Sequence, residues 1–357
     1  MVTFITNFYI FASDTETTEV TNAIFDIKNE AEFIDMSLDT FRFQYSSCRP
    51  YRDYVDLTGT DPDSVTTLAD IPFAPISLFR THRMSTSSVD EIVFTSSGTT
   101  SGLQSRHHVA SAGMYRESFT RAFELFYGKP EQCNIYALLP SYLERDGSSL
   151  IYMVTELIKR SHDGGFFLYN HDELVERLNR RDRSRPTILF GVGFALLDLA
   201  ESHRLDLSDV IVMETGGMKG RRREITRSQL HATLQERLGV AKIHSEYGMC
   251  ELLSQAYSAG EGIFFAPPWM RILIRDENAP FVYRREGMPG GINVIDLANR
   301  YSCSFLQTDD LGRMVPGGGF TVEGRIEGSM LRGCNLLLDE LEAKKGGDTV
   351  PAKEAKL

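Results

Sequence analysis

Between residues 92 and 245 the chain alternates short apolar runs with amphipathic stretches of helical period. The apolar runs, each predicted to be a buried strand, are 92–94, 134–139, 187–190, 210–213 and 241–243. The predicted helices are 149–160, 172–180, 194–203 and 226–238. In the last of these, Thr226 and Gln229 form a capping box and Gly239 ends the helix. Strands that alternate with helices predict an α/β fold with a largely parallel sheet.

The flanking regions have a different pattern. Before residue 90, a rough helical stripe covers 31–45, and the proline-containing stretch 71–79 predicts an extended segment that leads to the first strand. After residue 260 the helical pattern fades, and the predicted strands are 272–274, 292–297 and 305–307. We therefore expect four parts: a helical N-terminal part (1–90), an α/β core (91–260), a small β-rich subdomain (261–322) and a short C-terminal lid with a tail (323–357).

Composition and charge exclude several classes of protein. The chain has 357 residues and a net charge of −11, which argues against general binding to nucleic acid or membrane surfaces. It has neither an apolar run long enough to span a membrane nor the basic start of a signal peptide. Its five cysteines are scattered, with no Cys-x-x-Cys pair, so neither a zinc site nor a disulfide framework is indicated. We expect a cytoplasmic protein.

Residues 95–102 (TSSGTTSG) directly follow the apolar run 92–94. Glycines allow the backbone N–H groups to approach an anion, and hydroxyl groups add further donors. The stretch lacks the lysine of a Walker loop, so it does not support a P-loop fold. It predicts either a phosphate-binding loop or a polar surface turn.

Three more polar clusters follow predicted strands. Gly216-Gly217 comes after 210–213, the segment 247–251 (YGMCE) after 241–243, and 308–312 (TDDLG) after 305–307. Ligands of open α/β sheets gather at the carboxyl ends of strands, so these turns can share one rim. Taken singly, each also fits a structural role: a closing turn, a packed aromatic side chain, a solvated carboxylate or a β-turn.

The order of these motifs resembles the adenylate-forming enzymes, which join a carboxylic acid to AMP. Residues 95–102 resemble their phosphate loop, 247–251 their Tyr-Gly-x-x-Glu segment and 308–312 their Thr-Gly-Asp-x-Gly turn. Residues 324–327 (GRIE) resemble their Gly-Arg-x-Asp hinge. Asp309 stands where glycine is usual in these enzymes, and Glu327 where aspartate is usual.

The chain is more narrowly similar to the LuxE-type acyl-protein synthetase family. The stretches that carry this similarity are 71–82, 106–108 (RHH), 216–222 and 331–336. The resemblance implies an α/β fold with a large N-terminal domain of mixed and parallel sheets, a small β-rich subdomain and a truncated C-terminal lid.

The resemblance also implies roles for individual residues. The groups that would hold the β- and γ-phosphates of ATP are Thr95, Ser96, Ser97, Gly98, Thr99 and Thr100. Gly216 and Gly217 would lie along the adenine, and Tyr247 would stack on it. Glu251 would bind Mg²⁺, Asp310 would accept hydrogen bonds from the ribose, and Arg325 would act at the hinge, near ribose or phosphate.

The implied reaction is ATP-dependent activation of a carboxylic acid, which the resemblance makes a fatty acid. The acyl-AMP would pass its acyl group to Cys334 and then to a partner such as a reductase or an acyl carrier protein. Only about 30 residues follow Arg325, and so short a lid argues against coenzyme A as the acceptor. For Cys334 the alternative is a buried apolar side chain. For the whole chain the alternatives are an acyl-CoA ligase similar to phenylacetate-CoA ligase and a non-catalytic nucleotide-binding relative.

Overall fold

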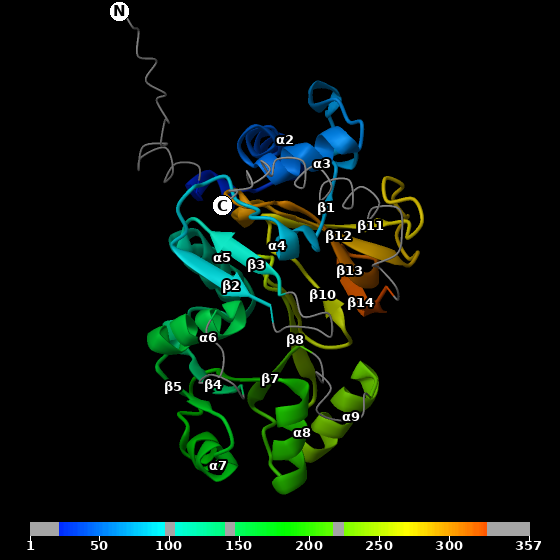
Figure 1. Cartoon of the computed structure of the whole chain (residues 1–357). Helices are drawn as coiled ribbons and strands as arrows, with labels where there is room; N and C mark the ends of the chain where they lie inside the picture. Colours follow the sequence, from blue (N-terminus) through cyan, green and yellow to red (C-terminus); the bar gives the residue numbers. More distant parts are fainter. Residues whose placement is uncertain (1–20, 97–103, 140–146, 217–224, 327–357) are drawn as a thin grey trace, which may run out of the picture.

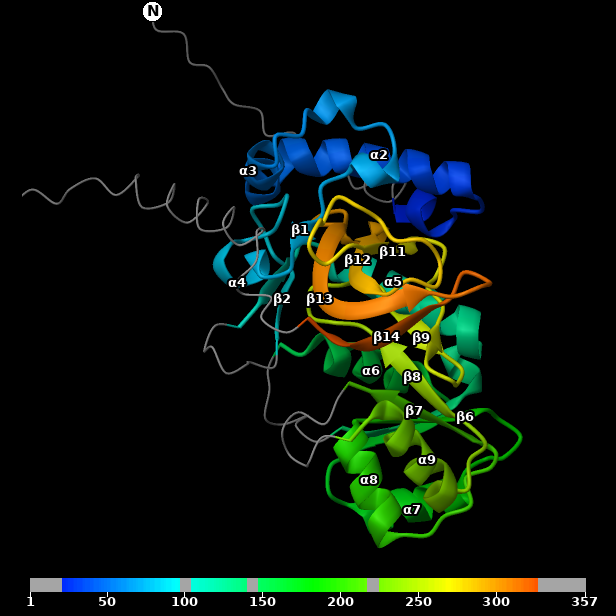
Figure 2. The same ribbon diagram turned by 90° about the vertical axis from the view of Figure 1, so that its right-hand side faces the viewer.

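The computed structural model describes residues 21–96, 104–139, 147–216 and 225–326. These residues form a core sheet, a second sheet and a two-stranded hairpin, which lie close together at the centre of the molecule (Figures 1 and 2). The core sheet lies in the lower half of Figure 1 and the second sheet in the upper half.

The core sheet has six strands in the order β5-β4-β6-β7-β8-β9. The first five are parallel and β9 is antiparallel to β8. Their bounds are β4 Asn134–Leu138, β5 Asp163–Phe167, β6 Thr187–Gly191, β7 Val210–Thr215, β8 Ile243–Tyr247 and β9 Ala256–Ser258. The largely parallel sheet that the sequence predicted is therefore confirmed.

Helices cover both faces of the core sheet. Figure 1 shows α5 (Ala112–Tyr127) and α6 (Ser149–Arg160) on one side, with α7 (His171–Arg180), α8 (Gly193–Ser202) and α9 (Arg227–Leu238) on the other. The capping box of α9 is present, and Gly239 ends the helix in the left-handed conformation at φ 68°. Helices α6 to α9 lie where the sequence predicted helices, whereas α5 was not predicted.

The second sheet has the order β10-β14-β13-β12-β11, and β1 pairs with β13 in parallel. Its strands are β1 Ala74–Pro75, β10 Ile263–Phe264, β11 Met270–Arg275, β12 Gly290–Asp296, β13 Phe305–Met314 and β14 Phe320–Arg325. Helices α2 (Glu30–Ser47) and α3 (Arg49–Leu57) lie beside it. The amide of Gln44 donates to the carbonyls of Asn299 and Arg300, which fixes α2 on this sheet.

The third sheet is a hairpin of β2 (Ile92–Thr95) and β3 (Arg106–Val109). The predicted phosphate loop therefore connects two antiparallel strands. The helix α4 (Leu78–Thr81) precedes the hairpin and overlaps the last two residues of the stretch 71–79, which the sequence predicted to be extended and which contains β1. The remaining short elements are the 3₁₀ turns η1 Pro62–Ser64, η2 Leu68–Asp70, η3 Pro130–Gln132 and η4 Leu297–Asn299.

The predicted turn at 308–312 is wrong, because these residues lie inside β13. Asp309 and Asp310 have a composition typical of turns, but β12 and β14 bind β13 from both sides. A Cβ at Gly312 would lie 2.0 Å from the carbonyl oxygen of Thr321 on β14, so this glycine permits a close strand approach. The predicted strand 241–243 is displaced, because β8 begins only at Ile243 and ends at Tyr247. The predicted strand 210–213 is confirmed within β7, which continues to Thr215.

Candidate functional site

The two ends of the predicted phosphate loop are joined at the loop end of the hairpin, next to the Thr95–Arg106 pair. The N–H of Ser96 donates to the carbonyl of Ser105 (3.1 Å), and the N–H of Ser105 donates to Oγ of Ser96 (3.0 Å). The N–H of Thr95 donates to the carbonyl of Gly147 (2.7 Å), in the segment before α6. These bonds hold the base of the hairpin together and link it to the segment before α6.

Glu251 lies in the turn between β8 and β9 and is 6% exposed. Its carboxylate accepts a hydrogen bond from the side chain of Ser105. Burial raises the pKa of Glu251, whereas the Ser105 hydrogen bond and the positive charges of Arg80 and Arg325 lower it. The carboxylate is thus held at the base of the hairpin, where burial outweighs these contacts and leaves its pKa above the usual value.

Buried side chains from other elements hold the turn that carries Glu251. Nδ1 of His107 on β3 donates to the carbonyl of Cys250 (2.8 Å), and Nδ2 of Asn299 donates to the carbonyl of Glu251 (2.7 Å). The carboxylate of Asp296 accepts from the N–H groups of Leu253 (2.8 Å) and Ser254 (3.0 Å). These contacts fix the backbone on both sides of Glu251, which limits where its carboxylate can point.

Tyr247, Asp310 and Arg325 join the core sheet to the second sheet. Oη of Tyr247, at the end of β8, donates to Oδ2 of Asp310 on β13 (3.0 Å). Nε of Arg325 on β14 lies 3.6 Å from Oδ1 of Asp310, and Arg325 is directly opposite Asp310 in the strand register. The side chain of Arg325 is 78% exposed, so its charge is open to solvent and to ligands.

Burial is the largest influence on the pKa values of both Asp310 and Tyr247. It raises the pKa of Asp310, whereas the Arg325 charge and the Tyr247 hydrogen bond lower it. Burial and the neighbouring Asp310 carboxylate raise the pKa of Tyr247 well above its usual value. Tyr247 therefore stays protonated and donates to Asp310 throughout the physiological range.

The contacts connect residues that are far apart in the sequence. Ser96 bonds to Ser105, Ser105 bonds to Glu251, and the charge of Arg325 acts on both Glu251 and Asp310. Gly216 follows β7 with φ 69°, beside Tyr247 at the end of the neighbouring β8. The predicted site residues outside the described part of the chain are Ser97, Gly98, Thr99, Thr100, Gly217 and Cys334.

The ring of Tyr247 is buried beside two phenylalanine rings, so little of its surface is open for stacking on a base. It is 7% exposed, and its ring lies 5.5 Å from that of Phe320 and 6.0 Å from that of Phe264 between centroids. Adenine stacking by Tyr247 stays a prediction, while its hydrogen bond to Asp310 gives it a second role that the sequence did not indicate.

Replacing Tyr247 with phenylalanine removes the hydrogen bond to Asp310 and keeps the ring. We expect the free energy of unfolding to fall by about 1–2 kcal/mol, because the half-buried carboxylate loses a partner. We also expect KM for ATP to rise several-fold. Denaturant unfolding and steady-state kinetics measure both effects. Tyr136→Phe is the matched control, since Tyr136 donates to Asp163 (2.8 Å) in the core sheet; an equal rise in KM there would contradict the prediction.

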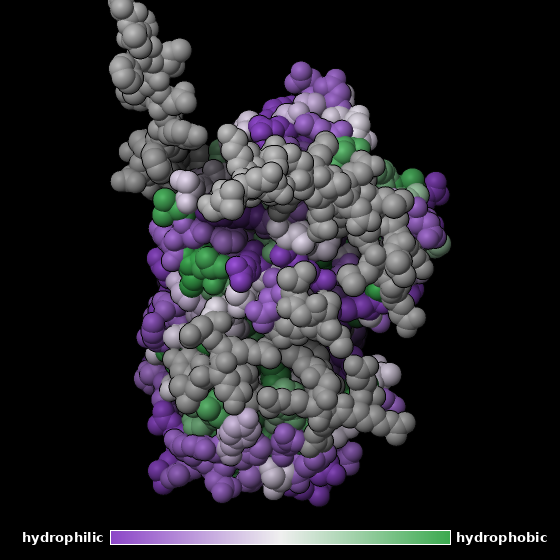
Figure 3. Space-filling model, viewed as in Figure 1, coloured by the Kyte–Doolittle hydropathy of each residue, from purple (hydrophilic) through white to green (hydrophobic). Residues whose placement is uncertain are grey.

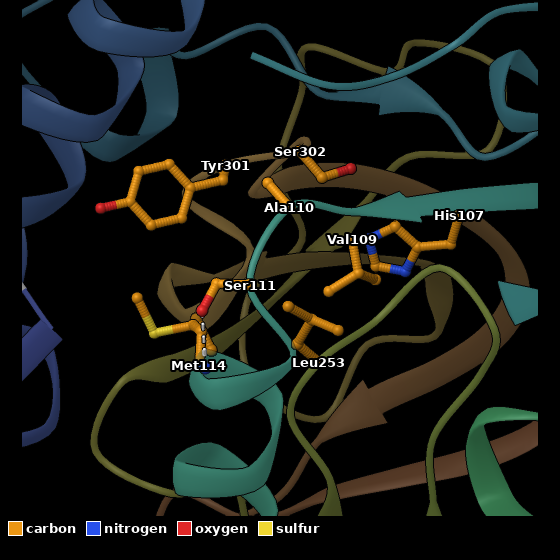
Figure 4. Close-up of a pocket in the computed structure, with 9 residues that line it drawn as sticks. His107, Val109, Ala110, Ser111, Met114, Leu253, Tyr301 and Ser302 are labelled. Carbon is orange, nitrogen blue, oxygen red and sulfur yellow. Dashed lines mark hydrogen bonds between the residues drawn. The ribbon is translucent and has the colours of Figure 1, made fainter. Parts of the chain in front are cut away.

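His107 makes stability depend on pH. It is fully buried, lines a small apolar cavity (Figure 4), and burial lowers its pKa from about 6.5 to about 4. Between these two pH values the unfolded chain therefore binds more protons than the folded protein. The contribution of neutral His107 to stability is fully present above about pH 6.5 and is lost as the pH falls towards about 4.

From pH 7 to pH 5 we expect this histidine to reduce the free energy of unfolding by about 2 kcal/mol. Denaturant unfolding of wild type and His107→Gln at both pH values measures the difference. The control is His162→Gln, at an exposed residue, which should keep the wild-type dependence. If wild type and His107→Gln respond to pH in parallel, His107 is not the titrating group.

The site suits Mg²⁺ bound through a nucleotide. Within the described ranges no cluster of three or more His, Cys, Asp or Glu side chains could hold a metal ion. Mg²⁺ is commonly bound by one or two carboxylates together with substrate phosphates. The buried carboxylate of Glu251, fixed beside the hairpin, matches that donor set.

Among the described residues no helix has both the length and the apolar character to cross a membrane. The described residues visible in Figure 3 are mostly hydrophilic, with apolar side chains in small separate patches.

Solved structures with a similar fold are known. A 2-hydroxyisobutyryl-CoA ligase in complex with its acyl-AMP superposes with a TM-score of 0.63 at 14% identity, over 83% of this chain and 68% of that one. ATP-bound MatB from Rhodopseudomonas palustris superposes with a TM-score of 0.50 at 17% identity, over 74% of this chain and 54% of that one. The fold is therefore that of the adenylate-forming enzymes.

The chain belongs to the LuxE acyl-protein synthetase family, whose model matches residues 24–342. A long-chain-fatty-acid–luciferin-component ligase from Photorhabdus luminescens is 45% identical over 71 residues, which are 19% of this chain and 60% of that protein. The LuxE-type family that the sequence motifs indicated is therefore confirmed, and the fold agrees with the adenylate-forming enzymes.

The structure adds residues that the motifs did not assign. Ser105, Asn299 and Asp296 contact Glu251 or its turn but lie outside every motif that was given a role. His107 and Arg80 belong to stretches that carried the family resemblance, 106–108 and 71–82, without any assigned function. Their roles depend on which tertiary contacts form, and no local pattern records those contacts.

Proposed function

We propose that this protein activates a carboxylic acid with ATP and passes the acyl group through Cys334 to a partner protein. The observation that carries the proposal is the connection of four distant motifs at one place. Ser96 lies at the hairpin, Glu251 beside it, and Asp310 with Arg325 on the second sheet. The fold alone does not require these polar groups to meet.

In the first step a carboxylate oxygen attacks the α-phosphorus of ATP. A new P–O bond forms, the bond to the β-phosphate bridging oxygen breaks, and pyrophosphate leaves with the electron pair. Such transfers depend mainly on positioning and on stabilisation of negative charge. The hairpin loop would hold the β- and γ-phosphates and Asp310 the ribose, while Arg325 supplies exposed positive charge.

Mg²⁺ would be held by Glu251 and the phosphates, and it supplies charge neutralisation for the leaving pyrophosphate. The hydrogen bonds from His107 and Asn299 keep the Glu251 turn in place, so the carboxylate does not have to reorganise when the nucleotide binds.

In the second step a thiolate attacks the acyl carbon of acyl-AMP. The C–S bond forms, the C–O bond to phosphate breaks, and AMP leaves. Burial raises the pKa of each cysteine in the described ranges, to about 11 for Cys48, so none of these thiols is prepared to ionise.

This supports Cys334 as the acceptor. The N–H of Ile326 donates to the carbonyl of Asp309 (2.8 Å), which places the start of the C-terminal segment beside Asp310. Cys334 is eight residues further on, and such a segment spans at most about 28 Å. That reach includes the groups around Glu251 and Asp310.

The acid is proposed to be a fatty acid, and the final acceptor a protein such as a reductase or an acyl carrier protein. The name of the Photorhabdus relative, a ligase for long-chain fatty acids, supports this substrate class.

The test is ATP–pyrophosphate exchange with short-chain, long-chain and aromatic carboxylic acids, without coenzyme A. We expect exchange with long-chain acids. AMP release that requires coenzyme A would favour an acyl-CoA ligase. A protein that binds ATP but gives no exchange with any acid would contradict the proposal and favour a non-catalytic relative.

A further inference from the structure

Helix α4 lies between the second sheet, which carries Asp310 and Arg325, and the β2–β3 hairpin. The strand before it, β1, pairs in parallel with β13, and the N–H of Ile76 donates to the carbonyl of Gln307 (3.0 Å). On its other side, the ring of Phe79 meets the ring of His107 edge-on, with centroids 5.4 Å apart. Figures 1 and 2 both show α4 beside the hairpin.

These contacts place the next residue, Arg80, near the Glu251 turn. His107, against which Phe79 packs, bonds to the carbonyl of Cys250, the neighbour of Glu251. The Arg80 charge is close enough to the Glu251 carboxyl to lower its pKa. Arg80 is thus a positive charge beside the base of the predicted phosphate loop.

Arg80 has no carboxylate partner of its own among the described residues. Its side chain is half-buried, and no hydrogen bond or ion pair joins it to another described residue. By contrast, Arg83 one turn later bonds to Asp90 (2.5 Å). A half-buried guanidinium that no described carboxylate neutralises has lost part of its hydration, which favours binding of an anion beside it.

We propose that Arg80, beside the Glu251 turn, binds the β- and γ-phosphates of ATP and the pyrophosphate that leaves. The inference rests on the proposed function and adds a residue to it. Five N–H donors in a planar fork match phosphate oxygens in pairs, so Arg80 can follow the phosphates as the bond to the α-phosphorus breaks. The carboxylate of the acid substrate is the other anion of this reaction, and the test separates the two.

The experiment compares wild type with Arg80→Gln and Arg80→Lys by calorimetric titration with Mg·ATP, pyrophosphate and AMP. We expect Arg80→Gln to weaken binding of ATP and pyrophosphate at least tenfold and to leave AMP affinity within twofold. The affinities of Arg80→Lys should lie between those of wild type and Arg80→Gln, because lysine keeps the positive charge but lacks the planar set of N–H donors. Arg180→Gln, which removes an exposed charge on α7, should match wild type.

Three results would overturn the inference. One is unchanged affinity for ATP and pyrophosphate in Arg80→Gln. Another is an equal loss for AMP, which would indicate a distorted site. A third is a raised KM for the acid alone, which would assign Arg80 to the carboxylate. Wild type that binds ATP without exchanging pyrophosphate contradicts the proposed function, yet the binding comparison still decides the role of Arg80. Wild type that fails to bind ATP overturns both.

Discussion

A Cys334→Ser variant is expected to exchange pyrophosphate at the wild-type rate and to carry no acyl label that hydroxylamine removes. Adenylation needs no thiol, whereas transfer needs a nucleophile that attacks a mixed anhydride, and a serine hydroxyl is far less reactive at neutral pH. Incubation with ATP and a radiolabelled long-chain acid, followed by gel analysis with and without hydroxylamine, measures the label. The expected effect is complete loss of the thioester with adenylation intact.

The matched control is Cys133→Ser. Cys133 is buried and its Sγ lies 3.5 Å from the carbonyl oxygen of Lys129, so it is not available as an acceptor. This variant should retain the full label. If Cys334→Ser kept wild-type labelling, the acyl group would have to reside elsewhere, and the route through Cys334 would be wrong.

Glu251→Gln is expected to lower the rate of exchange by roughly a hundredfold or more. The amide keeps the shape of the side chain but removes the negative charge beside the hairpin. Exchange measured across a Mg²⁺ titration should also lose its wild-type dependence on the ion. Glu91→Gln is the control, because the carboxylate of Glu91 accepts from the N–H of Ala112 at the start of α5 (2.7 Å), and the amide oxygen of glutamine can replace it there. Full activity of Glu251→Gln would remove Glu251 from the site.

The same variant should not be less stable than wild type at neutral pH. Burial raises the pKa of Glu251 above its unfolded value, so ionisation destabilises the folded protein as the pH rises through that folded value. The neutral amide avoids this effect, and its advantage should grow with pH. Denaturant unfolding at pH 5 and pH 8 tests the sign; a variant that loses stability with rising pH relative to wild type would contradict it.

The parallel strands and the end of α9 could be predicted because their signals are local. An apolar run, a capping box and a glycine at the C-terminus each report a conformation within a few residues. The segment 308–312 shows the limit of that approach. Its aspartates and glycine are typical of turns, yet pairing with β12 and β14 places it inside a strand.

The residues of the candidate site show the same difference between local signals and distant contacts. Glu251, Asp310 and Arg325 could be named because they stand in motifs with a family resemblance. Ser105, Asn299 and Arg80 could not be assigned, because their importance depends on distant partners. Asn299 contributes to the site because its amide donates to the carbonyl of Glu251, which lies 48 residues earlier in the sequence.

The pairing of β1 with β13 has a consequence for synthesis of the chain. Ala74 is opposite Leu306, so the first-made strand of the second sheet lacks its partner until most of the polypeptide has left the ribosome. Asp310 and Arg325 emerge later still, after the hairpin and Glu251. A nascent or prematurely terminated chain that ends before Asp310 therefore lacks two of the groups on which the proposed nucleotide site depends, and its second sheet is incomplete.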